Sequence, residues 1–100
     1  MKKNIDYIWI NIVNNENEIF TTIKGIEYTY TVENGFILIN GDKRRRITKD
    51  AIESALKIEN PSPSKINNEN IWGPSYVYGI ITDERIVKCK QGIFGKKYFV

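Results

Sequence analysis

Residues 26–41, IEYTYTVENGFILING, carry the clearest structural pattern of this 100-residue chain. Apolar and polar residues alternate through 26–33, which is typical of a strand with one buried face and one wet face. The Asn-Gly pair at 34–35 favours a two-residue hairpin turn, because both residues tolerate a positive φ. Residues 36–39 supply the returning strand, and a second Asn-Gly pair at 40–41 predicts another turn. We therefore expect an antiparallel hairpin in this stretch.

The segments before this hairpin extend the predicted sheet. The isoleucines of residues 7–13 alternate with Tyr, Trp and Asn, so a strand is expected there. Residues 19–24 form a short run rich in β-branched residues. The first 41 residues are therefore expected to form a three- or four-stranded antiparallel sheet. Tyr28 and Tyr30 could stack bases on an open sheet, but their apolar neighbours favour a place in the core.

The pattern changes to helix signals at Ile47. Thr48 is a good N-cap residue, and Asp50 in the first turn is favoured by the helix dipole. Ile47 and Ile52 occupy the two positions of a hydrophobic staple. These signals predict a helix that runs to about Ile58.

Further helices and a hairpin are expected after this point. Ser62 and Pro63 suit the start of a short helix to about residue 68. Residues 75–83 follow a Gly-Pro pair and are expected to be helical, although their Tyr, Val and Ile residues also suit a strand. Residues 86–100 read as a C-terminal basic β-hairpin, or wing, with a glycine in its loop.

The predicted fold class is α+β, with a single domain that spans residues 1–100. The N-terminal half, residues 1–41, is the antiparallel sheet. The second half, residues 42–100, contains two or three helices and the C-terminal basic hairpin.

Charge is strongly segregated along the chain. The formal charge is −2 in residues 1–41, +3 in 42–58, −3 in 59–84 and +5 in 85–100, for a total of +3. Segregated cations are typical of a surface that binds a polyanion, and nucleic acid is the commonest one. The sequence therefore predicts a small non-catalytic nucleic-acid-binding protein, with DNA favoured over RNA as the partner.

Two basic clusters would contact the phosphates. Their members are Lys43, Arg44, Arg45, Arg46, Arg85, Lys88, Lys90, Lys96 and Lys97. Three adjacent arginines are notable because the planar guanidinium grips phosphate with two hydrogen bonds. Two alternatives stay open. The arginines could pair with Glu27 or Glu33. The C-terminal lysines could have no role in binding and instead protect a solvated edge hairpin from aggregation.

The stretch YVYGIITDERIV at 76–87, followed by KQGIFG at 90–95, resembles a winged-helix DNA-binding module that would span residues 47–100. The resemblance implies a recognition helix in a groove and a wing that grips flanking phosphates. This chain departs from the pattern because residues 75–83 contain no Arg, Lys, Asn or Gln to read bases. Taken whole, the chain also looks like small uncharacterised bacterial and mobile-element proteins.

Several functional classes are disfavoured by composition. The chain has one cysteine and no histidine, so an internal disulfide, a His/Cys metal site and a histidine base are excluded within it. No carboxylate spacing matches a metal-dependent nuclease, and we expect no catalytic residue, no metal and no cofactor. Because neither a signal-peptide pattern nor an apolar run of membrane-spanning length is present, we expect a cytoplasmic protein without a membrane partner.

An alternative function is an inhibitor, encoded by a phage or plasmid, that binds a host protein such as a nucleic-acid-handling defence complex. Ile, Asn and Lys supply 40 of the 100 residues, which fits an AT-rich source such as a mobile element. The candidate anchors of a protein interface are the aromatic residues Trp72, Tyr76 and Tyr78, because large aromatics dominate such interfaces.

Overall fold

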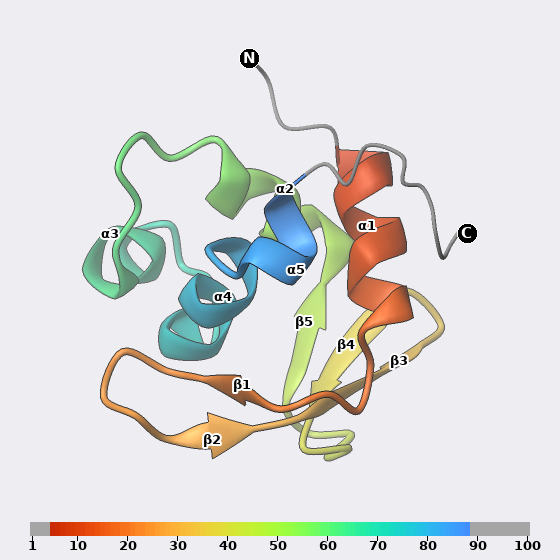
Figure 1. Cartoon of the computed structure of the whole chain (residues 1–100). Helices are drawn as coiled ribbons and strands as arrows, with labels where there is room; N and C mark the ends of the chain where they lie inside the picture. Colours follow the sequence, from red (N-terminus) through yellow and green to blue (C-terminus); the bar gives the residue numbers. More distant parts are fainter. Residues whose placement is uncertain (1–4, 89–100) are drawn as a thin grey trace.

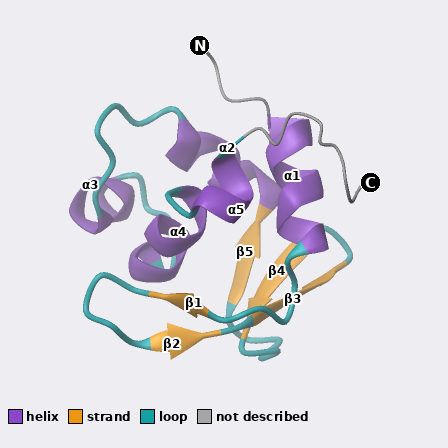
Figure 2. Cartoon of the chain, viewed as in Figure 1, coloured by secondary structure: helices purple, strands orange, loops and turns teal. Residues whose placement is uncertain are grey.

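The computed structural model describes residues 5–88 (Figure 1), and it confirms the α+β class. Along the chain lie α1 (Ile5–Asn14), β1 (Phe20–Thr21), β2 (Glu27–Tyr28), β3 (Tyr30–Glu33), β4 (Phe36–Ile39), β5 (Arg46–Thr48), α2 (Lys49–Leu56), α3 (Pro63–Asn68), α4 (Pro74–Ile81) and α5 (Glu84–Val87). Strands β1 and β2 form one antiparallel sheet, and the order β3-β4-β5 forms another. The helices lie in the upper part of Figure 2 and the strands mainly in its lower part.

The predicted strand at 7–13 is wrong, because this segment belongs to helix α1. Ile8 and Ile12 are four residues apart and therefore share one helical face, which is buried. Ile10 lies on another face and is 57% exposed. Ile8 and Ile12 fit either period, whereas Ile10 fits only the strand. The helix is held by tertiary contacts: the Asn11 side-chain amide donates to the Ile86 carbonyl at 2.7 Å.

The predicted turns and the return strand are confirmed. Asn34 and Gly35 adopt φ values of 52° and 81°, and the second Asn-Gly pair is also left-handed. The predicted single strand at 26–33, however, is divided between the two sheets at Thr29. The Thr29 N–H donates to the Asn40 side-chain oxygen at 3.1 Å, and its carbonyl accepts from the Asn40 N–H at 2.8 Å. The third strand of the β3-β4-β5 sheet is β5, which comes from beyond residue 41 and was not predicted.

The core lies between the sheets and the helices. Tyr28 and Tyr30 are 3% and 0% exposed, so their predicted place in the core is confirmed. The Tyr30 hydroxyl donates to the Ile12 carbonyl at 2.6 Å, which fixes α1 against β3. Ile26, in contrast, was expected on the same apolar face and is 58% exposed.

The helix starts follow the expected capping chemistry. The Thr48 hydroxyl accepts from the Ala51 N–H at 3.0 Å, and α2 ends at Leu56, two residues before the expected end. Ser62 caps α3, with Pro63 as its first residue. Helix α4 begins at Pro74, so residues 75–81 are helical rather than extended.

The predicted C-terminal strand is wrong at Ile86 and Val87, which belong to helix α5. The Asp83 carboxylate accepts from the Arg85 N–H at 2.8 Å and so caps this helix. Local side-chain hydrogen bonding therefore outweighs the strand preference of the β-branched residues. The remainder of the predicted hairpin, including Lys90, Lys96 and Lys97, lies outside the described residues.

Candidate functional site

The first basic cluster lies on the exposed turn between β4 and β5 and at the start of β5. Arg44 Nε lies 3.4 Å from Asp42 Oδ1, and Arg45 Nε lies 3.8 Å from Asp42 Oδ2. Lys43 Nζ lies 4.0 Å from Glu33 Oε1, but among the described residues none of the three arginines pairs with Glu27 or Glu33, so the alternative left open for the arginines is wrong. Hydrogen bonds from Arg44, first from its backbone N–H, lower the pKa of the Asp42 carboxyl. Local acids therefore neutralise part of this cluster.

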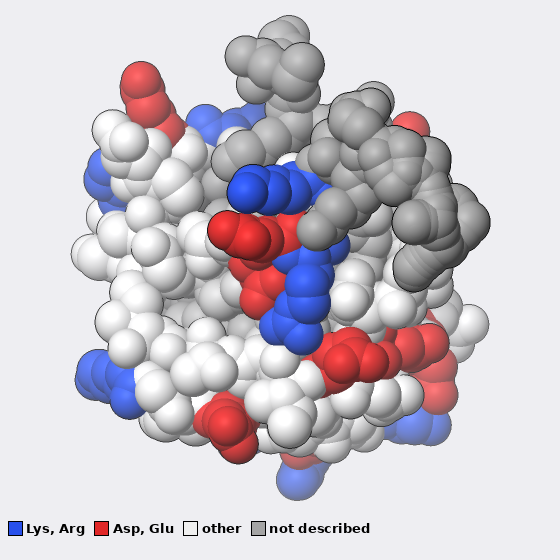
Figure 3. All heavy atoms as spheres, viewed as in Figure 1, with Lys and Arg blue, Asp and Glu red and all other residues white. Residues whose placement is uncertain are grey.

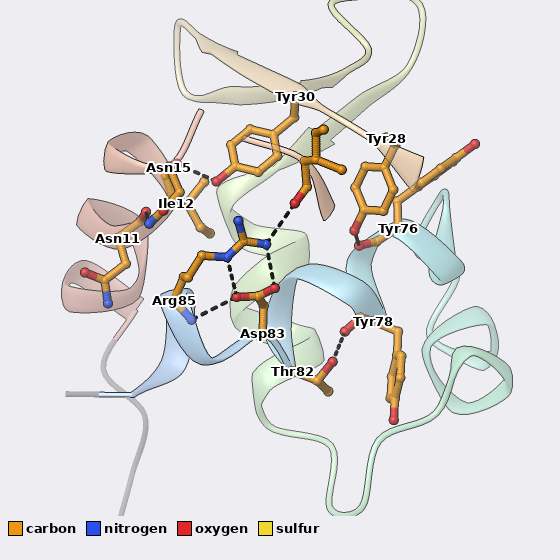
Figure 4. Close-up of polar contacts among 11 residues, drawn as sticks. Asn11, Ile12, Asn15, Tyr28, Tyr30, Tyr76, Tyr78, Thr82, Asp83 and Arg85 are labelled. Carbon is orange, nitrogen blue, oxygen red and sulfur yellow. Dashed lines mark hydrogen bonds and ion pairs between the residues drawn. The ribbon is translucent and has the colours of Figure 1, made fainter. Parts of the chain in front are cut away.

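Arg85, from the second cluster, is a structural residue. Its guanidinium makes hydrogen bonds of 2.8 and 2.9 Å to Asp83 and one of 3.0 Å to the Ile19 carbonyl (Figure 4). The guanidinium carbon also lies 4.1 Å from the centroid of the Phe20 ring. The side-chain hydrogen bond between Arg85 and Asp83 lowers the pKa of Asp83 and raises that of Arg85. These contacts join α5 to the residue before β1 and occupy two of the three guanidinium nitrogens, Nε and Nη2.

The described residues do not bring the two clusters together. In Figure 1 the β4–β5 turn lies at the lower edge of the view and α5 near its centre. Residues 5–88 contain ten of the fifteen cations and all twelve acids, so this part carries a formal charge of −2. Blue and red atoms adjoin one another in Figure 3 and form no continuous basic area on that face.

Replacement of Asp83 by asparagine is expected to lower the free energy of unfolding by about 1–2 kcal/mol at pH 7, because a charge-assisted hydrogen bond is lost. Asparagine is also a good N-cap, so the helix start is retained. The pKa of Asp83 is lowered by folding, so its stabilisation is present above the unfolded value of about 3.9 and is lost as the pH falls through the folded value. Urea unfolding should therefore show a difference in the free energy of unfolding between wild type and variant that is constant from pH 7 to about 5 and becomes smaller below about pH 4. A difference that is independent of pH would contradict the assignment of this stabilisation to the ionised Asp83 carboxylate.

A second surface feature lies between the β1–β2 turn and the start of α4. It is an open groove of about 330 Å³. Its lining residues come from these two segments: Thr22, Lys24, Ile26, Gly73, Pro74, Ser75 and Tyr76. The groove is therefore built from parts of the chain that are about fifty residues apart.

The surroundings of this groove are apolar and exposed. Ile23 is 65% exposed, Ile26 58% and Trp72 47%. The rings of Trp72 and Tyr76 are stacked with centroids 6.0 Å apart. In Figure 3 the area over α4 and the β1–β2 turn is mostly uncharged. Contiguous exposed apolar side chains of this kind mark interaction surfaces.

Contacts beneath the groove fix the β1–β2 hairpin on α4. The Tyr28 hydroxyl donates to the Tyr76 carbonyl at 2.9 Å, and the two rings meet edge to face with centroids 5.0 Å apart. Burial raises the pKa of Tyr28, so its hydroxyl stays protonated and can donate at any ordinary pH. Gly79 faces this hydroxyl directly, and its missing Cβ lets the hairpin approach the helix.

The structure brings together two of the three predicted interface aromatics. Trp72 and Tyr76 lie at the groove, whereas Tyr78 points away from Tyr76 in Figure 4. Ile26 lines the groove, and the exposed Ile23 lies between the lining residues Thr22 and Lys24; neither isoleucine was predicted to belong to an interface. The two isoleucines in and beside this turn could have indicated an exposed apolar surface, but the alternation through 26–33 placed Ile26 in the predicted core.

Within residues 5–88, no group of three or more metal-binding side chains is close enough to hold an ion. Across that same range no helix is long and apolar enough to cross a membrane.

Comparison with protein-family models, with curated proteins and with solved structures gave no match.

Proposed function

We propose that this chain is a small, non-catalytic protein-binding module that contacts its partner through the groove. The observation that carries the proposal is the exposed apolar cluster of Ile23, Ile26 and Trp72 around a groove that Tyr76 lines. Interface energy is concentrated in a few large side chains at the centre of a contact, and Trp and Tyr are the most frequent among them.

Burial of the exposed isoleucines would supply part of the binding energy. Complete burial of an isoleucine side chain contributes about 1.5–3 kcal/mol, so each of the two partly exposed isoleucines would contribute roughly half of that on binding. The Tyr76 ring is packed edge to face against Tyr28 and stacked with Trp72, so part of its side-chain entropy is already lost before binding.

The AT-rich composition supports a phage or plasmid setting for this module. In such a setting it would act in the cytoplasm as an inhibitor that binds a host protein, for example a component of a nucleic-acid-handling defence complex. The groove would then be the surface that recognises the host protein.

Substitution of Ile23 by aspartate is expected to abolish capture of a partner from a host-cell lysate, because a charge would be buried in the contact. Trp72→Ala should weaken the same capture at least tenfold. Ile10→Asp is the matched control: Ile10 is 57% exposed and lies on α1, at the other side of the molecule in Figure 1. Capture would be quantified after immobilisation of each variant. Equal retention of the partner by all variants would contradict the proposal.

A second candidate function is nucleic-acid binding, with DNA favoured, through the exposed β4–β5 turn. The specific observation is the exposure of its cations: the Arg44 side chain is 92% exposed and that of Lys43 is 80% exposed. The Arg46 guanidinium carbon lies 5.1 Å from the centroid of the Phe36 ring at the start of β4, so this third arginine is packed along the sheet and Arg44 is the more available cation.

Simultaneous replacement of Arg44, Arg45 and Arg46 by alanine tests this second function. If three phosphate contacts are lost, the slope of log affinity against log salt should fall by about 3. Fluorescent single- and double-stranded oligonucleotides at 50 and 200 mM salt would provide the measurement. The double variant Lys57→Ala/Lys65→Ala is the control, because it removes exposed cations elsewhere. Absence of wild-type binding at 50 mM salt would exclude the nucleic-acid function.

A further inference from the structure

We infer that the groove recognises an extended peptide segment of the partner in which a bulky apolar side chain lies next to an Asp or Glu carboxylate. This inference rests on the proposed protein-binding function and specifies the chemistry of the partner. It follows from the charge and the polarity of the groove.

The groove lining contains one charged side chain, and it is a cation. Lys24 lies on the β1–β2 turn, and no acidic residue is among the lining residues. Within the described part of the chain Lys24 has no ion pair, whereas six other cations there do: Lys43, Arg44, Arg45, Lys49, Arg85 and Lys88. An unpaired ammonium beside an apolar surface is complemented by a carboxylate on the partner.

The start of α4 also contributes partial positive charge to the groove. Gly73 supplies no side-chain cap, and residues 73–76 line the groove. The first N–H groups of a helix have no acceptor within the helix and carry partial positive charge, which also favours an anionic partner group. Lys24 and this helix start both line the groove, so both contribute positive charge to it.

The apolar part of the lining specifies the neighbouring side chain. Ile26, Pro74 and Tyr76 form apolar walls, and the exposed Trp72 ring stacks on Tyr76. A volume of about 330 Å³ is at the lower end for ligand pockets, which suits one or two side chains of a peptide. A nucleic-acid strand would bring one phosphate for each base, and the single lining cation would leave most of these charges unmatched.

A heptapeptide display library, selected on the immobilised full-length protein, would test the inference. The expected result is enrichment of peptides with a Leu, Ile, Phe, Trp or Tyr within two positions of an Asp or Glu. The best synthetic peptide should bind at least fivefold more tightly than its amide version, in which Asn or Gln replaces the acid. Lys24→Gln should remove that difference, whereas Lys57→Gln should preserve it.

The other outcomes distinguish failure of the carboxylate inference from failure of the proposed function. Peptides that lose binding with Ile23→Asp but show no preference for an acid would overturn the carboxylate inference and leave the proposed function standing. Failure to enrich any peptide whose binding depends on Ile23 and Trp72 would overturn both. Displacement of the peptide by a single-stranded thymidine oligonucleotide that binds in a Lys24-dependent manner would assign the groove to nucleic acid and overturn the inference.

Discussion

Gly79→Ala is expected to lower the free energy of unfolding by about 2 kcal/mol, although alanine is the better helix former. A Cβ at this position would lie 2.5 Å from the Tyr28 hydroxyl oxygen and 3.1 Å from the Thr21 carbonyl oxygen. Neither atom can move freely, because the hydroxyl is bonded to the Tyr76 carbonyl and Thr21 belongs to β1. The hairpin and α4 would have to separate, and the groove between them would change shape. Urea denaturation followed by tryptophan fluorescence would measure the loss.

A double-mutant cycle identifies the cause of this loss. In a Tyr28→Phe background the closest atom is absent, so Gly79→Ala should be less destabilising than in the wild type. The intrinsic helix preference of alanine would add about 0.5–1 kcal/mol in the stabilising direction in both backgrounds. An increase in stability with Gly79→Ala in the wild-type background would show that the contact between the hairpin and α4 is looser than described.

Features specified by short-range chemistry were predicted correctly from the sequence. The left-handed Asn-Gly pairs formed the expected turns, and Thr48 and Ser62 capped the expected helices. Each of these depends on the backbone preferences of one or two residues, so no knowledge of the rest of the fold is required.

Features specified by long-range packing were not predicted. Ile8, Ile10 and Ile12 together fit the strand period better than the helix period. The Asn11 contact with α5 joins residues that are 75 positions apart, so no local pattern could predict it. The strand at 26–33 had no local signal for its division at Thr29, because that division depends on hydrogen bonds to Asn40. Strand β5 begins within the arginine run, and Ile47 is its single buried residue. It therefore lacks the apolar alternation from which a strand is predicted.

The candidate site was predicted in part for the same reason. Residue type alone was enough to identify Trp72 and Tyr76 as possible anchors, but not to show that the turn with Ile23 and Ile26 lies against them. The charge pattern identified the cations correctly as exposed for Lys43 and Arg44. It could not show that Arg85 binds an acid two residues away and a carbonyl in another element.

Arg85→Lys is expected to lower the free energy of unfolding by about 2 kcal/mol, even though the charge is retained. Lysine cannot reproduce the planar fork that bonds both Asp83 oxygens and the Ile19 carbonyl, nor the stacking of the guanidinium on Phe20. Hydrogen bonds to charged groups contribute about 1.5–3 kcal/mol each, but the Arg85 side chain is 38% exposed, so solvent reduces the total.

Arg45→Lys is the matched control, because Arg45 is comparably exposed at 45% and its nearest contact with an acid is 3.8 Å long. This exposed ion pair should contribute little, so the free energy of unfolding should remain nearly unchanged. If Arg85→Lys were equally harmless while it weakened oligonucleotide binding, Arg85 would be a phosphate contact instead of a structural one. A large loss of stability without any change in oligonucleotide binding would establish that Arg85 is a structural residue, which stabilises the fold by joining α5 to β1.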